Sequence, residues 1–109
     1  MSTLSTHVLD TALGKPAQGI PVSLEHEGAI VSSGMTDADG RVRELLPKGA
    51  PLSPGSYRLT FAVAEYLARA GHPSFYDKIV VQFTVGAGQE RFHVPLLLSP
   101  FGYTTYRGS

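Results

Sequence analysis

Two of the four histidines in this sequence occupy positions suited to acid–base chemistry. His7 and His93 each lie in a segment where apolar and polar residues alternate, a pattern typical of half-buried β-strands. In both segments the histidine falls on the face opposite the larger apolar residues, so it points away from the core. Imidazole titrates near neutral pH and can serve as a general acid or base. Since a strand histidine is more often inert than catalytic, the pattern alone leaves both possibilities open.

The other two histidines have simpler interpretations. His26 stands between Glu25 and Glu27. A strand places it on the face opposite both carboxylates, which favours a solvated position over a metal site. His72 precedes Pro73 at the end of a predicted helix, where it can pair with the last helical carbonyls. We therefore expect His72 to be a cap or loop residue.

Several short motifs do not develop into recognisable sites. Asp37-Ala38-Asp39-Gly40 begins like a calcium loop, but Arg41-Val42-Arg43 follows and no glutamate closes the loop, so a turn is predicted. Gly86-Ala87-Gly88 lacks the third glycine and the helix of a dinucleotide site. A Gly-x-Ser-x-Gly elbow is absent. The acidic residues are scattered and select no carboxylate pair for glycoside chemistry.

Composition limits the class of protein. The 109 residues predict one domain, residues 1–109. Nine basic and nine acidic residues cancel, which argues against nucleic acid or an anionic membrane surface as partner. Cysteine is absent, which excludes disulfides, thiolate metal sites and a cysteine nucleophile. The apolar stretches are too short for a transmembrane helix, and the N-terminus lacks the features of a secretory signal, so a cytoplasmic location is expected.

The elements that must position the histidines are predicted to be almost entirely β-strands. Twelve glycines and eight prolines are scattered at short intervals and separate alternating segments, as in an all-β sandwich of two packed antiparallel sheets. One helix is predicted, over Ala64–Ala70 with Gly71 at its C-cap, and Gly86–Gly88 is predicted to be a hairpin turn. The expected strands cover residues 4–10, 20–25, 29–36, 41–46, 57–63, 79–85, 91–98 and 103–107, with loops at 11–18 and 47–55.

Four segments, in order along the chain, resemble the transthyretin-like 5-hydroxyisourate hydrolases. They are Leu4-Ser5-Thr6-His7-Val8-Leu9-Asp10 with Gly14-Lys15-Pro16-Ala17, then Thr36-Asp37-Ala38-Asp39-Gly40-Arg41, then Phe92-His93-Val94-Pro95-Leu96-Leu97-Leu98-Ser99-Pro100, and the terminal Tyr106-Arg107-Gly108-Ser109. Each segment alone is a weak signal. Together they span the chain and place the tetrapeptide flush at its end, which makes the resemblance specific.

The resemblance implies a fold, an assembly and an activity. The fold would be a transthyretin-like sandwich of two four-stranded antiparallel sheets with one short helix. The assembly would be a homotetramer, a dimer of dimers with active sites at the dimer–dimer interface. The activity would be hydrolysis of 5-hydroxyisourate, the product of urate oxidation, to 2-oxo-4-hydroxy-4-carboxy-5-ureidoimidazoline, with no metal or organic cofactor.

The resemblance also implies roles for particular residues. His7 and His93 would form the acid–base pair around the attacking water, and which of them is the base stays open. Arg41 would bind substrate oxygens and stabilise developing negative charge. Ser109 would hold water or substrate through its hydroxyl or its terminal carboxylate. The remaining substrate-binding positions would be Tyr106, Arg107 and Gly108.

Two other functions compete with the hydrolase. The transthyretin branch of the fold carries small ligands without chemistry, and fold alone does not distinguish the two. A generic β-sandwich adhesion or carbohydrate-binding module would be a monomer with exposed aromatic residues at one end. The two histidines, the arginine and the terminal tetrapeptide favour the hydrolase, although a chain end is usually frayed.

Overall fold

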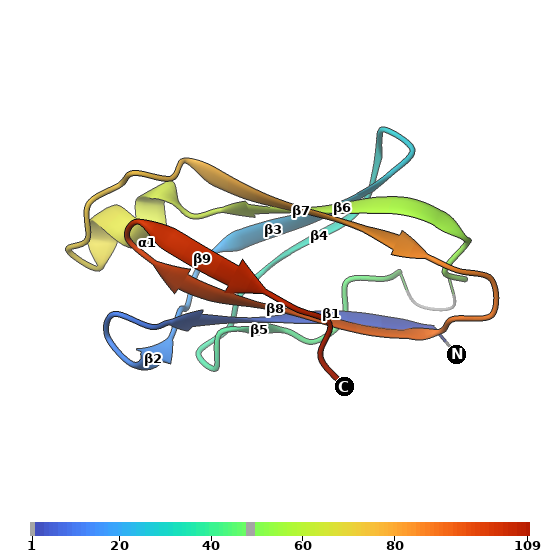
Figure 1. Cartoon of the computed structure of the whole chain (residues 1–109), viewed down its shortest axis with the longest axis horizontal. Coiled ribbons are helices and arrows are strands. Elements are labelled where there is room, and N and C mark those ends of the chain that lie inside the picture. The colour runs from blue at the N-terminus through green and yellow to red at the C-terminus, as the bar shows by residue number, and fades with distance from the viewer. Residues whose placement is uncertain (1, 48–49) are drawn as a thin grey trace.

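The alternating segments form two β-sheets packed face to face, with a short helix at one end (Figure 1). This computed structural model describes residues 2–47 and 50–109. The first sheet has the order β2-β1-β8-β9, with β5 also paired to β1, and the second has the order β4-β3-β6-β7. The first contains β1 (Thr3–Asp10), β2 (Lys15–Pro16), β5 (Arg41–Val42), β8 (Arg91–Ser99) and β9 (Gly102–Thr105); the second contains β3 (Pro21–His26), β4 (Ala29–Met35), β6 (Gly55–Ala62) and β7 (Lys78–Val85).

The core lies between the sheets and is built from the apolar positions of the alternation. Leu4 and Val8 of β1 and Leu96 of β8 are fully buried from one side, and Leu59 and Phe61 of β6 from the other. Full burial of one such side chain contributes about 1.5–3 kcal/mol. The intervening positions, which include His7 and His93, are only half-buried. The prediction that both histidines lie on the face away from the core is confirmed.

The predicted two-sheet architecture is confirmed, with two differences in how the strands connect. β1 and β8 pair in parallel, so the first sheet is mixed rather than antiparallel. The turn at Gly86–Gly88 does not close a hairpin, because β7 lies in the second sheet and β8 in the first. The turn carries the chain from one layer to the other (Figure 1). The expected strand over 41–46 is also shorter, since only Arg41–Val42 pairs with a neighbour.

The single predicted helix is present as α1 (Ala64–Arg69). Ala70 is its C-cap, and Gly71 follows with a φ of +79°, the left-handed conformation that ends many helices. Tyr66 and Leu67 are buried against the sheets. No helix within residues 2–47 and 50–109 is long and apolar enough to cross a membrane.

A buried carboxylate fastens the end of α1 to the end of β1. Asp10 is 1% exposed, and its Oδ2 accepts hydrogen bonds from Tyr66 Oη at 2.7 Å and His72 Nε2 at 2.8 Å. Its Oδ1 accepts from the backbone N–H groups of Ala12 and Leu13, each at 3.0 Å. His72 is a loop residue at the end of α1, as predicted, and its backbone N–H donates to the Leu67 carbonyl at 2.8 Å. Its side chain, however, pairs with a carboxylate brought in from β1 rather than with the helical carbonyls.

Loss of this carboxylate's charge is expected to weaken the fold at neutral pH. Burial acts to raise the pKa of Asp10, but its hydrogen bonds outweigh burial and hold the pKa below the ordinary value of 3.8. Because the folded-state pKa is the lower one, the stabilisation is present above the unfolded-state pKa and is lost as pH falls through the folded-state pKa. Asp10→Asn should therefore lower the free energy of unfolding at pH 7 by about 1–3 kcal/mol.

Urea unfolding curves of the wild type and Asp10→Asn between pH 7 and pH 3 test this expectation. The gap between the two proteins should shrink as the pH drops below about 4, where the Asp10 carboxylate of the unfolded wild type begins to take up its proton. Asp77→Asn, the same change at an exposed aspartate, should leave the curves unchanged. A gap independent of pH would contradict the electrostatic account.

Candidate active site

A tight turn positions Arg41 in the first sheet. Asp37 Oδ1 accepts two backbone N–H groups of the turn, including that of Arg41 at 3.0 Å. Gly40 has a φ of +75°, and a Cβ there would collide with the carbonyl oxygen of Val8. Glycine at this position thus lets the turn lie directly against β1. The resulting antiparallel pairing sets Arg41 opposite His7.

The parallel pairing of β1 and β8 brings His93 to the same face. Its register sets His93 beside Ser5, two residues before His7 on β1. Residues two apart on a strand share a face, so both histidines and Arg41 belong to one surface of the first sheet. Ser5 Oγ lies 2.8 Å from His93 Nδ1, within hydrogen-bond distance.

The C-terminal tail folds back over the His93 ring. The Gly108 N–H donates to the His93 carbonyl at 2.7 Å. A Cβ on Gly108 would lie 2.7 Å from His93 Cδ2, so the backbone packs directly on the imidazole. The guanidinium of Arg107 lies 4.4 Å from the centre of the Phe92 ring, and its Nη2 donates to the Arg91 carbonyl at 3.2 Å. These contacts hold the chain end in place rather than leaving it frayed.

These residues surround an open cavity of about 830 Å³. Five predicted site residues line it: Arg41, His93, Arg107, Gly108 and Ser109. His7 lies beside the cavity, paired with Arg41. Tyr106 is 53% exposed and lines a neighbouring groove between β7 and β9. Of the predicted site residues, the structure thus places five around the cavity and His7 next to Arg41, whereas Tyr106 is not among the residues that line it.

The charges around the cavity favour a neutral His93. Burial lowers the pKa of His93, and the positive charges of Arg41 and His7 lower it further. A hydrogen bond with the Ser5 backbone acts in the opposite direction but does not outweigh them. An imidazole that stays neutral near pH 7 keeps one ring nitrogen free to accept a proton.

Sequence analysis missed four residues that line this cavity: Thr3, Ser5, Arg91 and Phe92. Ser5 shares its strand face with His7, and that spacing was the one available signal. Its contact with His93 depends on the register between two strands that are 88 residues apart, which local patterns do not encode.

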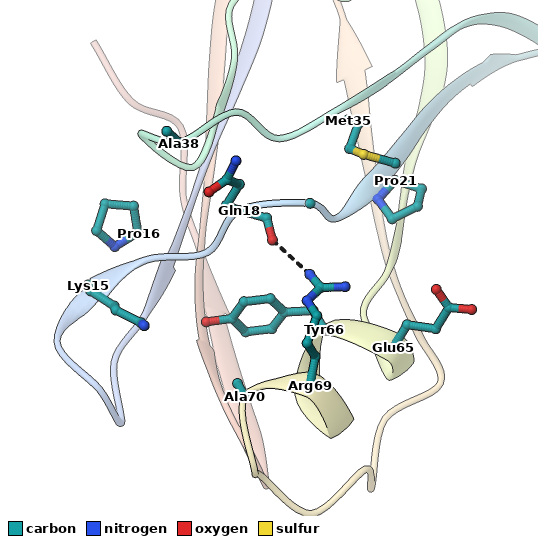
Figure 2. A pocket seen from close by; sticks show the side chains of 11 residues that line it. Lys15, Pro16, Gln18, Pro21, Met35, Ala38, Glu65, Tyr66, Arg69 and Ala70 are labelled. Atoms are coloured by element: carbon teal, nitrogen blue, oxygen red, sulfur yellow. Dashed lines mark hydrogen bonds between the residues drawn. The ribbon is translucent and has the colours of Figure 1, made fainter.

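A second open groove lies beyond the other end of β1, between the segment Lys15–Gly19 and α1 (Figure 2). Arg69 reaches across it and donates from Nη2 to the Gln18 carbonyl at 2.9 Å (Figure 2). Its guanidinium also lies 5.7 Å from the Tyr66 ring centre. This arginine thus serves to join α1 to the β1–β3 connection. Within the described part of the chain, no group of three or more His, Cys, Asp or Glu lies close enough to hold a metal ion.

Comparisons with known proteins agree with the fold. Residues 4–108 match the model of the HIUase/Transthyretin family. A 5-hydroxyisourate hydrolase of Caulobacter vibrioides is 44% identical over 117 aligned residues that cover all of both chains. The solved structure of a Klebsiella pneumoniae 5-hydroxyisourate hydrolase superposes with a TM-score of 0.88 at 43% identity, again over all of both chains. A sea bream transthyretin in complex with thyroxine superposes with a TM-score of 0.84 at 29% identity, covering 97% of this chain and 94% of that one.

Proposed function

This chain belongs to the HIUase/transthyretin family, and from that premise we propose that it hydrolyses 5-hydroxyisourate to 2-oxo-4-hydroxy-4-carboxy-5-ureidoimidazoline in the breakdown of urate. One observation carries the proposal beyond family membership. Arg41, His93 and the terminal residues Gly108 and Ser109 come from three separate parts of the chain and meet at one cavity. The arrangement supplies what opening a cyclic amide requires: a base and a cationic group that holds the substrate oxygens.

The reaction needs a proton acceptor and then a proton donor. Water attacks the ring carbonyl, a new C–O bond forms and its proton leaves to a base. The ring C–N bond then breaks, and the departing nitrogen takes a proton. In the proposed mechanism His7 and His93 share these tasks, and a well-placed acid–base group contributes about 10²–10⁴-fold in rate.

Arg41 has the properties needed to hold the substrate and its developing charge. Its guanidinium is planar, permanently charged and matched to pairs of oxygen acceptors. When water adds to the carbonyl, negative charge builds on the carbonyl oxygen, and a fixed cation lowers the energy of that state. The same charge lowers the pKa of His93, so one residue supports both the base and the oxyanion.

The chain end is proposed to be part of the site, so an extension beyond Ser109 should impair catalysis. Gly108 and Ser109 line the cavity, and added residues would have to leave through it. We expect a short C-terminal extension to lower kcat/KM about tenfold or more by misplacing cavity groups, with no change in Tm. The control is the same protein released with Ser109 as its last residue. Equal kcat/KM for both forms would mean that the end plays no part.

A coupled assay tests the proposed activity. Urate oxidase generates 5-hydroxyisourate from urate, and the ultraviolet decay of the compound is followed with and without this protein. We expect the decay to accelerate in proportion to protein concentration. A rate equal to spontaneous decay, from folded protein that ends at Ser109, would contradict the proposal.

We further propose that copies of this chain assemble as a homotetramer with the sites at the interface between dimers. Two features of the single chain support assembly: unpaired strand edges and exposed apolar side chains. β7 and β9 are edge strands, which invite pairing with another copy. Near β9, Phe75 and Phe101 are each 67% exposed and Tyr103 is 43% exposed, an unusual grouping of apolar surface. Light scattering should give a mass of four chains, and a monomer at working concentration would contradict the assembly.

A ligand carrier is the second candidate function, favoured by the likeness to a transthyretin bound to thyroxine. A carrier needs a channel but no acid–base groups. The neutral His93 beside Arg41 therefore supports the hydrolase over the carrier. The coupled assay also separates the two, since a carrier binds its ligand without consuming it.

A further inference from the structure

Ser5 touches the proposed catalytic machinery without having been assigned any role in it. Its side chain and that of His93 project from paired positions of β1 and β8 on the same face of the sheet. Ser5 Oγ lies 2.8 Å from His93 Nδ1. One nitrogen of the His93 ring is therefore engaged by the protein. Within the described part of the chain, the other nitrogen, Nε2, has no hydrogen-bond partner and is left for the cavity.

The open position of Nε2 indicates which ring nitrogen carries the proton. The Ser5 hydroxyl can donate to Nδ1 or accept from it, so this contact alone fits either tautomer. A base in the cavity must accept a proton at Nε2, the nitrogen that the protein leaves unengaged. Ser5 Oγ then accepts from the Nδ1–H group. In a neutral ring, a proton on Nδ1 leaves Nε2 with a free lone pair.

We propose that Ser5 is a positioning residue that holds neutral His93 with its proton on Nδ1, so that Nε2 accepts the proton of the attacking water. In this assignment His93 is the general base of the pair, and Ser5 acts on substrate only through it. The inference rests on the proposed hydrolase function for its kinetic consequences. The protonation state of the ring, by contrast, is a property of the free protein.

The charged groups around the ring are consistent with this role. Arg41 of β5 and His7 of β1 disfavour a second proton on the ring. Arg107 and Ser109 of the tail line the same cavity. With Ser5 Oγ as acceptor, the single proton of the neutral ring is held on Nδ1.

The kinetic test uses Ser5→Ala and Ser5→Thr. Ser5→Ala should lower kcat/KM about 10–100-fold, the usual cost of removing a group that orients an active histidine. Ser5→Thr keeps the hydroxyl and should restore most of the rate. Ser33→Ala, the same change on an exposed position of β4, is the control and should leave kcat/KM unchanged.

A nitrogen-15 NMR experiment on the free protein tests the inference without substrate. In the wild type near neutral pH, His93 Nδ1 should be protonated and Nε2 unprotonated, and Ser5→Ala should raise the share of the opposite tautomer. A wild-type ring with its proton on Nε2 would overturn the proposal. So would a Ser5→Ala protein with wild-type kcat/KM, or a Ser5→Thr protein as impaired as Ser5→Ala. If the wild type shows no hydrolysis, the proposed function fails, and the NMR result still decides the role of Ser5.

Discussion

His93→Asn is expected to lower kcat/KM about 10²–10⁴-fold while the protein keeps its fold. Asparagine can retain a hydrogen bond with Ser5, but it cannot take up a proton near neutral pH. His93 is half-buried on the outer face of β8, so the substitution leaves the core between the sheets untouched. The measurement is kcat/KM from initial rates of 5-hydroxyisourate decay, with the spontaneous rate subtracted.

His26→Asn is the matched control for this substitution. His26 is also a strand histidine with a ring nitrogen on a hydrogen bond, from Nδ1 to the Ser56 carbonyl at 3.0 Å. It stacks on Tyr57 with ring centres 4.1 Å apart, in the second sheet and away from the cavity. Its loss should leave kcat/KM within error. Equal rates for His93→Asn and the wild type would remove His93 from the mechanism.

Gly108→Ala is expected to reduce kcat/KM about 10²-fold, because the tail can no longer pack on the imidazole. A methyl group at Gly108 would lie 2.7 Å from His93 Cδ2 and 3.3 Å from the His93 carbonyl oxygen. Either the ring must turn or the tail must lift, and a displacement of about 1 Å in an active site can cost two orders of magnitude. The tail contributes no side chain to the hydrophobic core, so Tm should change little.

Gly102→Ala supplies the control for the tail substitution. Gly102 begins β9 in the same C-terminal part of the chain, and a Cβ there would lie 3.6 Å from Ser99 Oγ, an ordinary contact. We expect Gly102→Ala to keep wild-type kcat/KM. If both alanine variants are equally active, the close packing of the tail on His93 has no catalytic importance.

The strand content of this fold could be predicted because each strand carries its own signal. Tyr57, Leu59 and Phe61 alternate with polar or small residues, and that period of two puts one face in the core wherever the strand lies. The turn at Asp37–Gly40 was equally local, since an aspartate side chain caps the turn and a glycine takes the left-handed conformation. The end of the single helix could also be predicted from a local signal, Gly71, which takes a positive φ.

Other features depend on contacts between distant segments and could not be predicted from local pattern. The Gly86–Gly88 signal is the same whether the next strand pairs with β7 or crosses to the other sheet. The parallel pairing of β1 with β8 satisfies the same alternation as an antiparallel one would. Asp10 and His72 each looked unremarkable, and their hydrogen bond exists only because α1 docks at the end of β1.

The residues of the candidate site also divide into those with a local sequence signal and those that depend on contacts between distant segments. His7 and His93 were recognisable as polar residues on the outer faces of strands, whereas Arg41 and the tail were found through resemblance rather than through physics. Ser5 was missed because its importance lies in a register between β1 and β8. Tyr106 was grouped with its neighbours in sequence, but it faces a groove beside β7.

The central claim is that the cavity of Arg41, His93 and the chain end turns over its substrate rather than holding it. The most direct measurement is the number of 5-hydroxyisourate molecules consumed per chain, above spontaneous decay, for the wild type and for Arg41→Ala at equal concentration. Our account predicts many turnovers per wild-type chain and a rate near the spontaneous one for Arg41→Ala. Consumption that stops at one molecule per chain, or equal turnover by both proteins, would contradict it.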